Sequence, residues 1–148
     1  NYFESIISTA HHKDDQLETV LMKLLRGVHI SNLYPMLPRS NCGKFIKPLL
    51  DIKKDELVTY MNNNSFNWFE DSSNNERKYK RNKVRLDLIP LMQELAGGSD
   101  PLQRRLMQLA DQSLEINELI NRQSMDFINE HVNYTYYNNT ITTVDINV

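Results

Sequence analysis

The stretch from Ile6 to Gly27 constrains the fold more than any other part of the sequence. It begins with five small, β-branched or apolar residues that carry no charge, as is typical of a buried parallel strand. Apolar residues then recur at helical spacing: Leu17, Val20, Leu21, Leu24 and Leu25. Asp15 stands where an N-cap is expected, and Glu18 follows three residues later as in a capping box. The stretch therefore predicts a strand, a tight turn and a helix.

Polar side chains gather where this strand gives way to its helix. They are His11, His12, Asp14, Asp15 and Glu18. Open α/β sheets bind ligands at the carboxyl ends of their strands, so a site is expected here. Carboxylates packed together repel one another unless a cation lies among them, and Mg²⁺ or an ammonium group would serve. A charged helix start without function is the alternative.

Zinc is the rival metal for this cluster. Two adjacent histidines cannot easily face one metal from the end of a strand. The only cysteine, Cys42, lies far along the chain. The donor set therefore favours oxygen ligands and magnesium over zinc.

Composition describes an ordinary globular chain. Of its 148 residues 40% are hydrophobic and 24% are charged, enough apolar content for one sizeable core. No apolar run approaches the roughly 18 residues of a membrane span, and no signal-peptide pattern is present. A single cysteine fits a reducing compartment. We therefore expect a cytoplasmic protein, or one of the plastid stroma if its gene is organellar, with no membrane partner.

A local basic segment covers residues 76–85. Its cations are Arg77, Lys78, Lys80, Arg81, Lys83 and Arg85, with Tyr79 among them and only Glu76 opposing. The formal net charge of the chain is −2, so this is a patch on a mildly acidic protein. Basic patches with an interleaved aromatic suit a phosphodiester backbone and a stacked base, and a solvated helix face is the alternative.

Further strands and helices are predicted around these motifs. Residues 45–50 read as a short strand, and a helix then begins at position 51 or 53. Its buried side is expected to carry Leu57, Val58 and Met61. Residues 66–69 are predicted to form one more strand.

The last third of the chain is predicted to be mainly helical. Residues 84–95 continue as a helix that Pro90 should kink, and Gly97 and Gly98 end it. We place the domain boundary there, which divides the chain into residues 1–97 and 98–148. Asp100 is then predicted as an N-cap with Pro101 at the first helical position, and a long apolar stripe predicts a helix that runs to about His131. Residues 140–148 alternate like a strand that has no partner nearby in the sequence.

Four blocks in order over residues 9 to 90 resemble one known family. The blocks are His11-His12-Lys13-Asp14-Asp15-Gln16-Leu17-Glu18-Thr19, Lys47-Pro48-Leu49-Leu50, Glu70-Asp71-Ser72-Ser73-Asn74, and Arg81-Asn82-Lys83-Val84-Arg85 followed by Pro90. They are similar to the motifs of the tRNA(Ile)-lysidine synthetases, members of the N-type ATP pyrophosphatase group. The chain departs from the family at Lys47, where arginine is usual, and at Leu86, where histidine is usual.

The resemblance implies both a fold and an activity. The fold is α/β, part of a doubly wound, Rossmann-like parallel sheet of the adenine nucleotide alpha hydrolase type, followed by a mainly helical segment. The activity is ATP-dependent ligation of free L-lysine to C2 of the wobble cytidine of tRNA(Ile) with a CAU anticodon, through an adenylated cytidine. ATP and Mg²⁺ are the implied cofactors, and the protein could form a homodimer.

Motif positions carry the family's site residues onto this sequence. The resemblance implies catalytic roles for His11, Asp15, Glu18 and Arg85, and substrate binding by Asn74, Arg77, Arg81 and Asn82. It also implies a metal at Asp15 and Glu18. In this division His11, Asp15 and Glu18 line the lysine and metal side, and Asn74 and Arg85 the nucleotide or cytidine side.

Two alternative functions remain open, and one motif of the family is missing from this sequence. A tRNA thiolase of the same group would share the fold but generally needs paired cysteines. A non-catalytic nucleic-acid-binding fragment is the other alternative. The family's phosphate-gripping Ser-Gly-Gly-x-Asp-Ser loop does not occur in this sequence, so we expect a piece of a longer enzyme that is inactive by itself.

Overall fold

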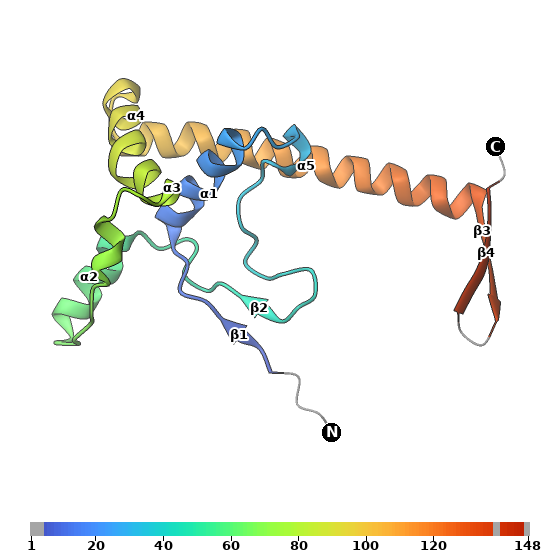
Figure 1. Cartoon of the computed structure of the whole chain (residues 1–148), viewed down its shortest axis with the longest axis horizontal. Coiled ribbons are helices and arrows are strands. Elements are labelled where there is room, and N and C mark those ends of the chain that lie inside the picture. The colour runs from blue at the N-terminus through green and yellow to red at the C-terminus, as the bar shows by residue number, and fades with distance from the viewer. Residues whose placement is uncertain (1–4, 138–139, 147–148) are drawn as a thin grey trace.

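Helices dominate the architecture of the chain. The structure, a computed structural model, describes residues 5–137 and 140–146. Its helices are α1 (Lys13–Leu25), α2 (Lys54–Asn63), α3 (Lys80–Lys83), α4 (Ile89–Ala96) and α5 (Ser99–His131), and its strands are β1 (Ile7–Ser8), β2 (Phe45–Ile46), β3 (Val132–Tyr137) and β4 (Thr140–Ile146). Helix α1 crosses the first half of α5, while α2 lies at the opposite side of the body from the β3–β4 hairpin (Figure 1). No helix among the described residues is both long and apolar enough to traverse a bilayer.

The first strand of the chain is short and exposed. β1 pairs in parallel with β2, Ile7 opposite Phe45 and Ser8 opposite Ile46. Ile7 is 50% exposed, so the prediction of a buried strand over residues 6–10 is wrong for this structure. The reason is that β1 and β2, with two residues each, form a two-stranded ladder among the described strands, and so small a ladder does not make a buried sheet layer. The predicted order of strand, helix and parallel strand is nevertheless present.

Helix α1 begins earlier than its sequence predicts. Its N-cap is His12, and Asp15 is the third helical residue, whose carboxylate accepts a hydrogen bond from the His12 N–H at 2.9 Å. The predicted capping box of Asp15 and Glu18 is therefore wrong, because the box lies one turn earlier. The neighbouring Asp14 carboxylate accepts from the Lys54 N–H at 2.8 Å and so ties the start of α1 to that of α2.

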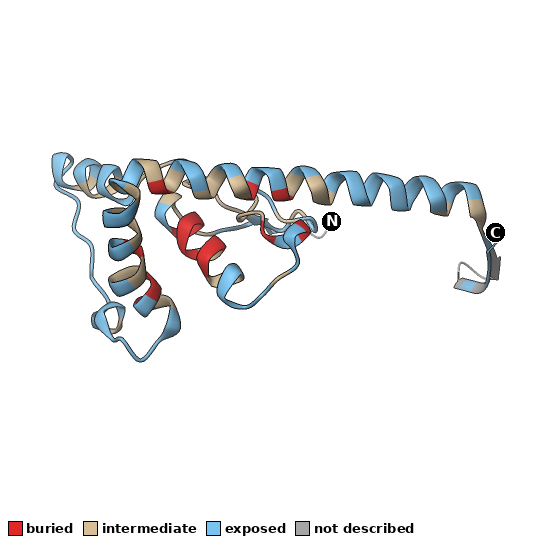
Figure 2. Ribbon diagram, turned by 90° about the horizontal axis from the view of Figure 1, so that it is seen from above, coloured by how far each residue is buried: buried red, intermediate tan, exposed pale blue. Residues whose placement is uncertain are grey.

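The core lies between α1, the helical segment after position 80, and the first half of α5. One cluster contains Leu17, Leu21, Val84, Ile89 and Leu102, and a second contains Val20, Leu33 and Ala110. Figure 2 shows these buried positions gathered on α1 and along one side of α5. Residues 99–110 of α5 thus share their core with the part of the chain before Gly97, and the division of domains at position 97 stays a prediction.

The helical segment over residues 80–96 is continuous but irregular. A π-helical turn, η3 (Val84–Leu88), joins α3 to α4, and Pro90 stands at the start of α4. The predicted disturbance at Pro90 is thus a local widening of the helix before it, where the missing proline N–H would otherwise break the ladder. Gly97 then ends α4 with a left-handed φ of +83°, as predicted.

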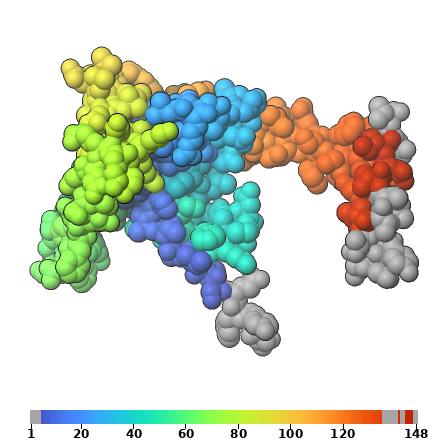
Figure 3. Space-filling model, in the orientation of Figure 1, coloured from blue at the N-terminus to red at the C-terminus, as the bar shows by residue number. Residues whose placement is uncertain are grey.

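The long helix α5 confirms the prediction from its apolar stripe. It begins at Ser99, two residues before Pro101, the predicted first helical residue, and ends at His131. Its second half stands clear of the rest of the molecule as an arm (Figure 3). Beyond it, β4 pairs antiparallel with β3, so the last strand does have a partner nearby, contrary to prediction. Residues 147 and 148, the end of that predicted strand, lie outside the described residues.

Two predictions around α2 are corrected. Residues 66–69 form no strand, because no partner strand lies alongside them among the described residues. The predicted buried residues of α2, Leu57, Val58 and Met61, are only partly buried. They line a cavity instead of a closed core.

Candidate functional site

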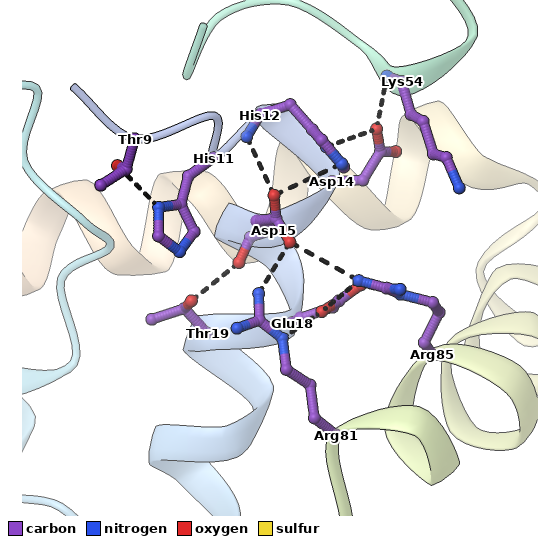
Figure 4. A network of polar contacts seen from close by, with 10 residues as sticks. All are labelled: Thr9, His11, His12, Asp14, Asp15, Glu18, Thr19, Lys54, Arg81 and Arg85. Carbon is purple, nitrogen blue, oxygen red and sulfur yellow. Dashed lines mark hydrogen bonds and ion pairs between the residues drawn. The ribbon is translucent and has the colours of Figure 1, made fainter. Parts of the chain in front are cut away.

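Two carboxylates of α1 bind two arginines that lie more than sixty positions later in the sequence. The Arg81 guanidinium donates from Nε to Glu18 Oε2 at 2.6 Å and from Nη2 to Asp15 Oδ1 at 2.7 Å. Arg85 donates from Nε to Glu18 Oε1 at 2.5 Å and from Nη2 to Oε2 at 3.1 Å. Figure 4 shows both guanidinium groups converging on α1 from the 80–85 segment. We call these four residues the carboxylate–arginine network.

Burial makes this network strong and mutually dependent. The Glu18 side chain is 2% exposed and that of Asp15 is 10% exposed, so neither carboxylate is compensated by water. The planar fork of arginine satisfies several carboxylate oxygens at once. The hydrogen bond that Arg85 donates to Glu18 raises the pKa of Arg85 above its usual range, although partial burial of the guanidinium acts in the opposite direction. The sequence predicted a cation among these carboxylates. The guanidinium groups of Arg81 and Arg85 supply that positive charge.

The two histidines of the motif occupy different places. His11 Nδ1 lies 2.9 Å from Thr9 Oγ1, whereas the His12 ring stands between two carboxylates, with Nδ1 3.4 Å from Asp14 and Nε2 3.3 Å from Asp15. His12 lines the largest cavity beside the network, and His11 is not among its lining residues. The sequence placed both histidines in the polar cluster, whereas the resemblance assigned a catalytic role to His11 alone, and that role stays a prediction.

The cavity lies against one side of the network. It has a volume of about 910 Å³ and is bounded by Leu57, Val58 and Met61 of α2, by Trp68, Phe69, Glu70, Asp71 and Asn74 of the following segment, and by His12 and Arg85. Arg85 is thus shared, since its guanidinium binds Glu18 while its side chain lines the cavity. Among the predicted site residues, Asn74 and Arg85 are brought to this cavity.

Other predicted substrate-binding residues hold the local structure. The buried Asn82 amide donates to the carbonyls of Ser73 and Glu76 at 2.8 and 3.0 Å, which shapes the loop that carries Asn74. Arg77 forms an exposed ion pair with Asp87 at 3.0 Å. Arg81 belongs to the network rather than to the cavity wall.

A metal at Asp15 and Glu18 stays a prediction. Within residues 5–137 and 140–146, no group of three or more His, Cys, Asp or Glu side chains is arranged to hold a metal ion. Both carboxylates already bind guanidinium groups, which compete with Mg²⁺ for the same oxygens. In this arrangement the pair does not fit direct ligation of a metal.

Comparison with known proteins places this site in a family. Residues 3–92 match the model of the PP-loop domain, an ATP-binding domain. The chain belongs to the PP-loop domain family. The carboxylate–arginine network and all the residues that line its cavity lie inside the matched part of this PP-loop domain.

Curated relatives of this PP-loop domain include tRNA(Ile)-lysidine synthases. That of Bacteroides thetaiotaomicron is 42% identical over 103 residues, which are 64% of this chain and 24% of that protein. That of Geobacter sulfurreducens is 32% identical over 140 residues, 94% of this chain and 29% of that protein. That of Staphylococcus epidermidis is 35% identical over 135 residues, 89% of this chain and 30% of that protein.

These matches confirm the resemblance carried by the four sequence blocks. The chain spans under a third of the length of these relatives, from 24% to 30%.

Proposed function

We propose that the protein containing this PP-loop domain ligates L-lysine to C2 of the wobble cytidine of tRNA(Ile) with a CAU anticodon. The cytidine O2 attacks the α-phosphorus of ATP and pyrophosphate leaves. The ε-amine of lysine then attacks C2, AMP leaves with the former O2, and the amine proton passes to solvent. The observation that carries this proposal is the carboxylate–arginine network beside a cavity, within a segment similar to the synthases.

Arg85 is the residue we assign to charge stabilisation. Its guanidinium is held by the buried Glu18, and its side chain lines the cavity, so its position is fixed before substrate binds. A pre-organised cation next to the departing AMP stabilises the negative charge that develops there. Asp15 and Glu18 contribute by orienting Arg81 and Arg85, which is a positioning role.

The lysine side of the site needs carboxylates that the arginines leave free. Glu70 and Asp71 line the same cavity and are exposed, so they can accept an ammonium group. Asn74 follows on the same loop and offers an amide to the cytidine or the nucleotide. His11 keeps its proposed role on the lysine side, and His12 joins it because it lines the cavity.

The remaining parts of the proposal concern what surrounds this chain. The exposed cations of the basic segment, Arg77, Lys78, Lys80 and Lys83, suit the phosphates of the tRNA. Mg²⁺ accompanies the ATP phosphates, and we assign it no protein ligand here. We propose that β1 and β2 belong to a larger, doubly wound sheet, that the enzyme works in the cytoplasm or the plastid stroma, and that a homodimer is compatible with it.

The test uses the full-length protein with ATP, L-lysine and tRNA(Ile). We expect AMP and pyrophosphate to form only when both lysine and tRNA are present, with lysine becoming bound to the tRNA. Binding of tRNA without lysine-dependent AMP formation would favour a nucleic-acid-binding module and overturn the proposal. Transfer of sulfur instead of lysine would favour a thiolase, although Cys42 is exposed and does not line the cavity.

A further inference from the structure

An aromatic segment is exposed at the edge of the candidate site. Phe66 is 51% exposed, Trp68 is 43% exposed and Phe69 is fully exposed. They lie in irregular chain between α2 and the short 3₁₀ turn η2 (Ser72–Asn75), and no strand of the described residues pairs with them. Large aromatic surfaces bury 150–250 Å² each when they find a partner, so their exposure together points to an interaction.

These three aromatic residues differ in what they face. Trp68 and Phe69 line the cavity that Arg85 and Asn74 also line. Phe66 does not line it, and its ring lies 6.4 Å from that of Tyr60 in a tilted arrangement. Trp68 and Phe69 therefore line the cavity, whereas Phe66, which is also exposed, lies outside it.

The polar groups of the cavity restrict what can cover these rings. An apolar peptide lying on Trp68 and Phe69 would desolvate the Glu70 and Asp71 carboxylates and offer them no hydrogen-bond donor beyond the Ser73 N–H that Asp71 already binds. A nucleobase differs, because its faces are aromatic while its edge carries hydrogen-bond donors and acceptors. The exposed cations of residues 77–83 begin three residues after Asn74 and can follow the phosphates that flank such a base.

We propose that Trp68 and Phe69 form the surface on which an unstacked pyrimidine base of single-stranded RNA stacks. The inference rests on the proposed function, since the base is that of the cytidine to be modified. The rings hold the face of the base, while Arg85 and Asn74 remain at its edge or at the attached nucleotide. Stacking on aromatic side chains contributes about 1–3 kcal/mol per base in single-strand binding.

Trp68 offers a direct measurement of this contact. It is the only tryptophan of the 148 residues. Its fluorescence in the full-length protein is obtained as the difference between the parent and Trp68→Phe. The probes are a short single-stranded RNA carrying the CAU anticodon sequence and the same RNA with an abasic site at the cytidine. We expect the first RNA to quench the Trp68 emission and the abasic RNA to leave it nearly unchanged.

Substitutions of the aromatic residues provide a second test of the stacking contact. Trp68→Ala and Phe69→Ala should each weaken binding of the CAU oligonucleotide about tenfold. Trp68→Phe, which keeps a ring, and Phe66→Ala, which changes an aromatic residue outside the cavity, should change binding less than about twofold. Circular dichroism melting of each variant identifies any that does not fold.

The two failures are distinguishable. Equal quenching by the two RNAs, or unchanged affinity in folded Trp68→Ala and Phe69→Ala, would overturn the stacking inference even if lysine-dependent AMP formation is intact. Because the comparison of the two RNAs uses the parent protein and Trp68→Phe alone, it remains decisive if an alanine variant fails to fold. Absence of lysine-dependent AMP formation, with normal quenching, would instead overturn the proposed function.

Discussion

Arg85 Nε lies 2.5 Å from the Oε1 of Glu18, a carboxylate whose side chain is 2% exposed. This contact joins α1 to the helical segment after position 80 across 67 residues of sequence. Arg81 reaches the same carboxylate from one turn earlier at 2.6 Å. The side of the cavity formed by Arg85 therefore depends on a charge buried in α1, and stability and site geometry are coupled through Glu18.

Glu18→Gln should lower the free energy of unfolding by about 2 kcal/mol, because hydrogen bonds to charged groups contribute ~1.5–3 kcal/mol. The amide keeps one acceptor oxygen but removes the charge that holds two guanidinium groups. Partial exposure of both arginines keeps the cost below that of a fully buried unpaired charge. Urea unfolding followed by circular dichroism measures this difference.

The control for Glu18 is Glu115→Gln, an exposed glutamate of α5 that should change stability by less than about 0.5 kcal/mol. In the full-length protein, Glu18→Gln should also reduce lysine-dependent turnover on the order of a hundredfold, or about 2.7 kcal/mol of transition-state binding. If Glu18→Gln has the same stability and turnover as the control Glu115→Gln, Glu18 has no special role in stability or catalysis.

Arg85→Lys should reduce kcat/KM for tRNA-dependent AMP formation about tenfold, or about 1.4 kcal/mol. Lysine retains the positive charge but loses the fork that binds Glu18 through two nitrogens. The matched control is Arg77→Lys, because Arg77 pairs with Asp87 at the surface and does not line the cavity. Equal kinetics for both variants would contradict a special role for Arg85.

Sequence patterns predicted the helices that bury one face, α1 and α5. The apolar stripes of α1 and α5 meet α4 and one another, so helical periodicity was enough to find them. The predicted strand over residues 66–69 failed because a strand needs a partner, and its apolar residues instead face solvent and the cavity. An alternating or apolar pattern indicates that side chains are buried, but it does not identify the surface that buries them.

The residue types of the candidate site were predicted from the sequence, but the pairing of its carboxylates with two arginines was not. Carboxylates at the start of α1 implied a nearby cation, but the resemblance assigned Arg81 to substrate binding and Glu18 to catalysis and a metal, and these roles stay predictions. Their pairing spans 63 residues, and no local spacing rule relates positions that far apart. The catalytic role of His11 stays a prediction, and of the two adjacent histidines it is His12, directly before the helix start at Lys13, that lines the cavity.

Ser40 should control the reactivity of Cys42. The Ser40 hydroxyl lies 3.3 Å from the Cys42 sulfur, and this hydrogen bond is the main cause that lowers the thiol pKa from its ordinary 9.0. A lower pKa means a larger thiolate fraction below pH 9, so Ser40→Ala should raise the pKa and slow alkylation by iodoacetamide at pH 7.5 roughly twofold. Ser40→Thr keeps the hydroxyl and should react like the parent. A pH series of alkylation rates that is identical in the alanine variant would contradict this.

Ser113 should be a larger contributor to stability than its type suggests. It is completely buried on α5, where its hydroxyl donates to the Ile30 carbonyl and accepts from the Tyr34 N–H at 2.9 Å. Ser113→Ala leaves both buried backbone groups without this partner, which should cost about 2 kcal/mol of unfolding free energy. Ser124→Ala, on the exposed second half of the same helix, should cost less than about 0.5 kcal/mol. Urea unfolding of the two variants separates loss of these hydrogen bonds from a change in helix propensity, because both replace serine by alanine within α5. Equal midpoints for the two would show that the 30–34 loop is held to α5 by its apolar contacts alone.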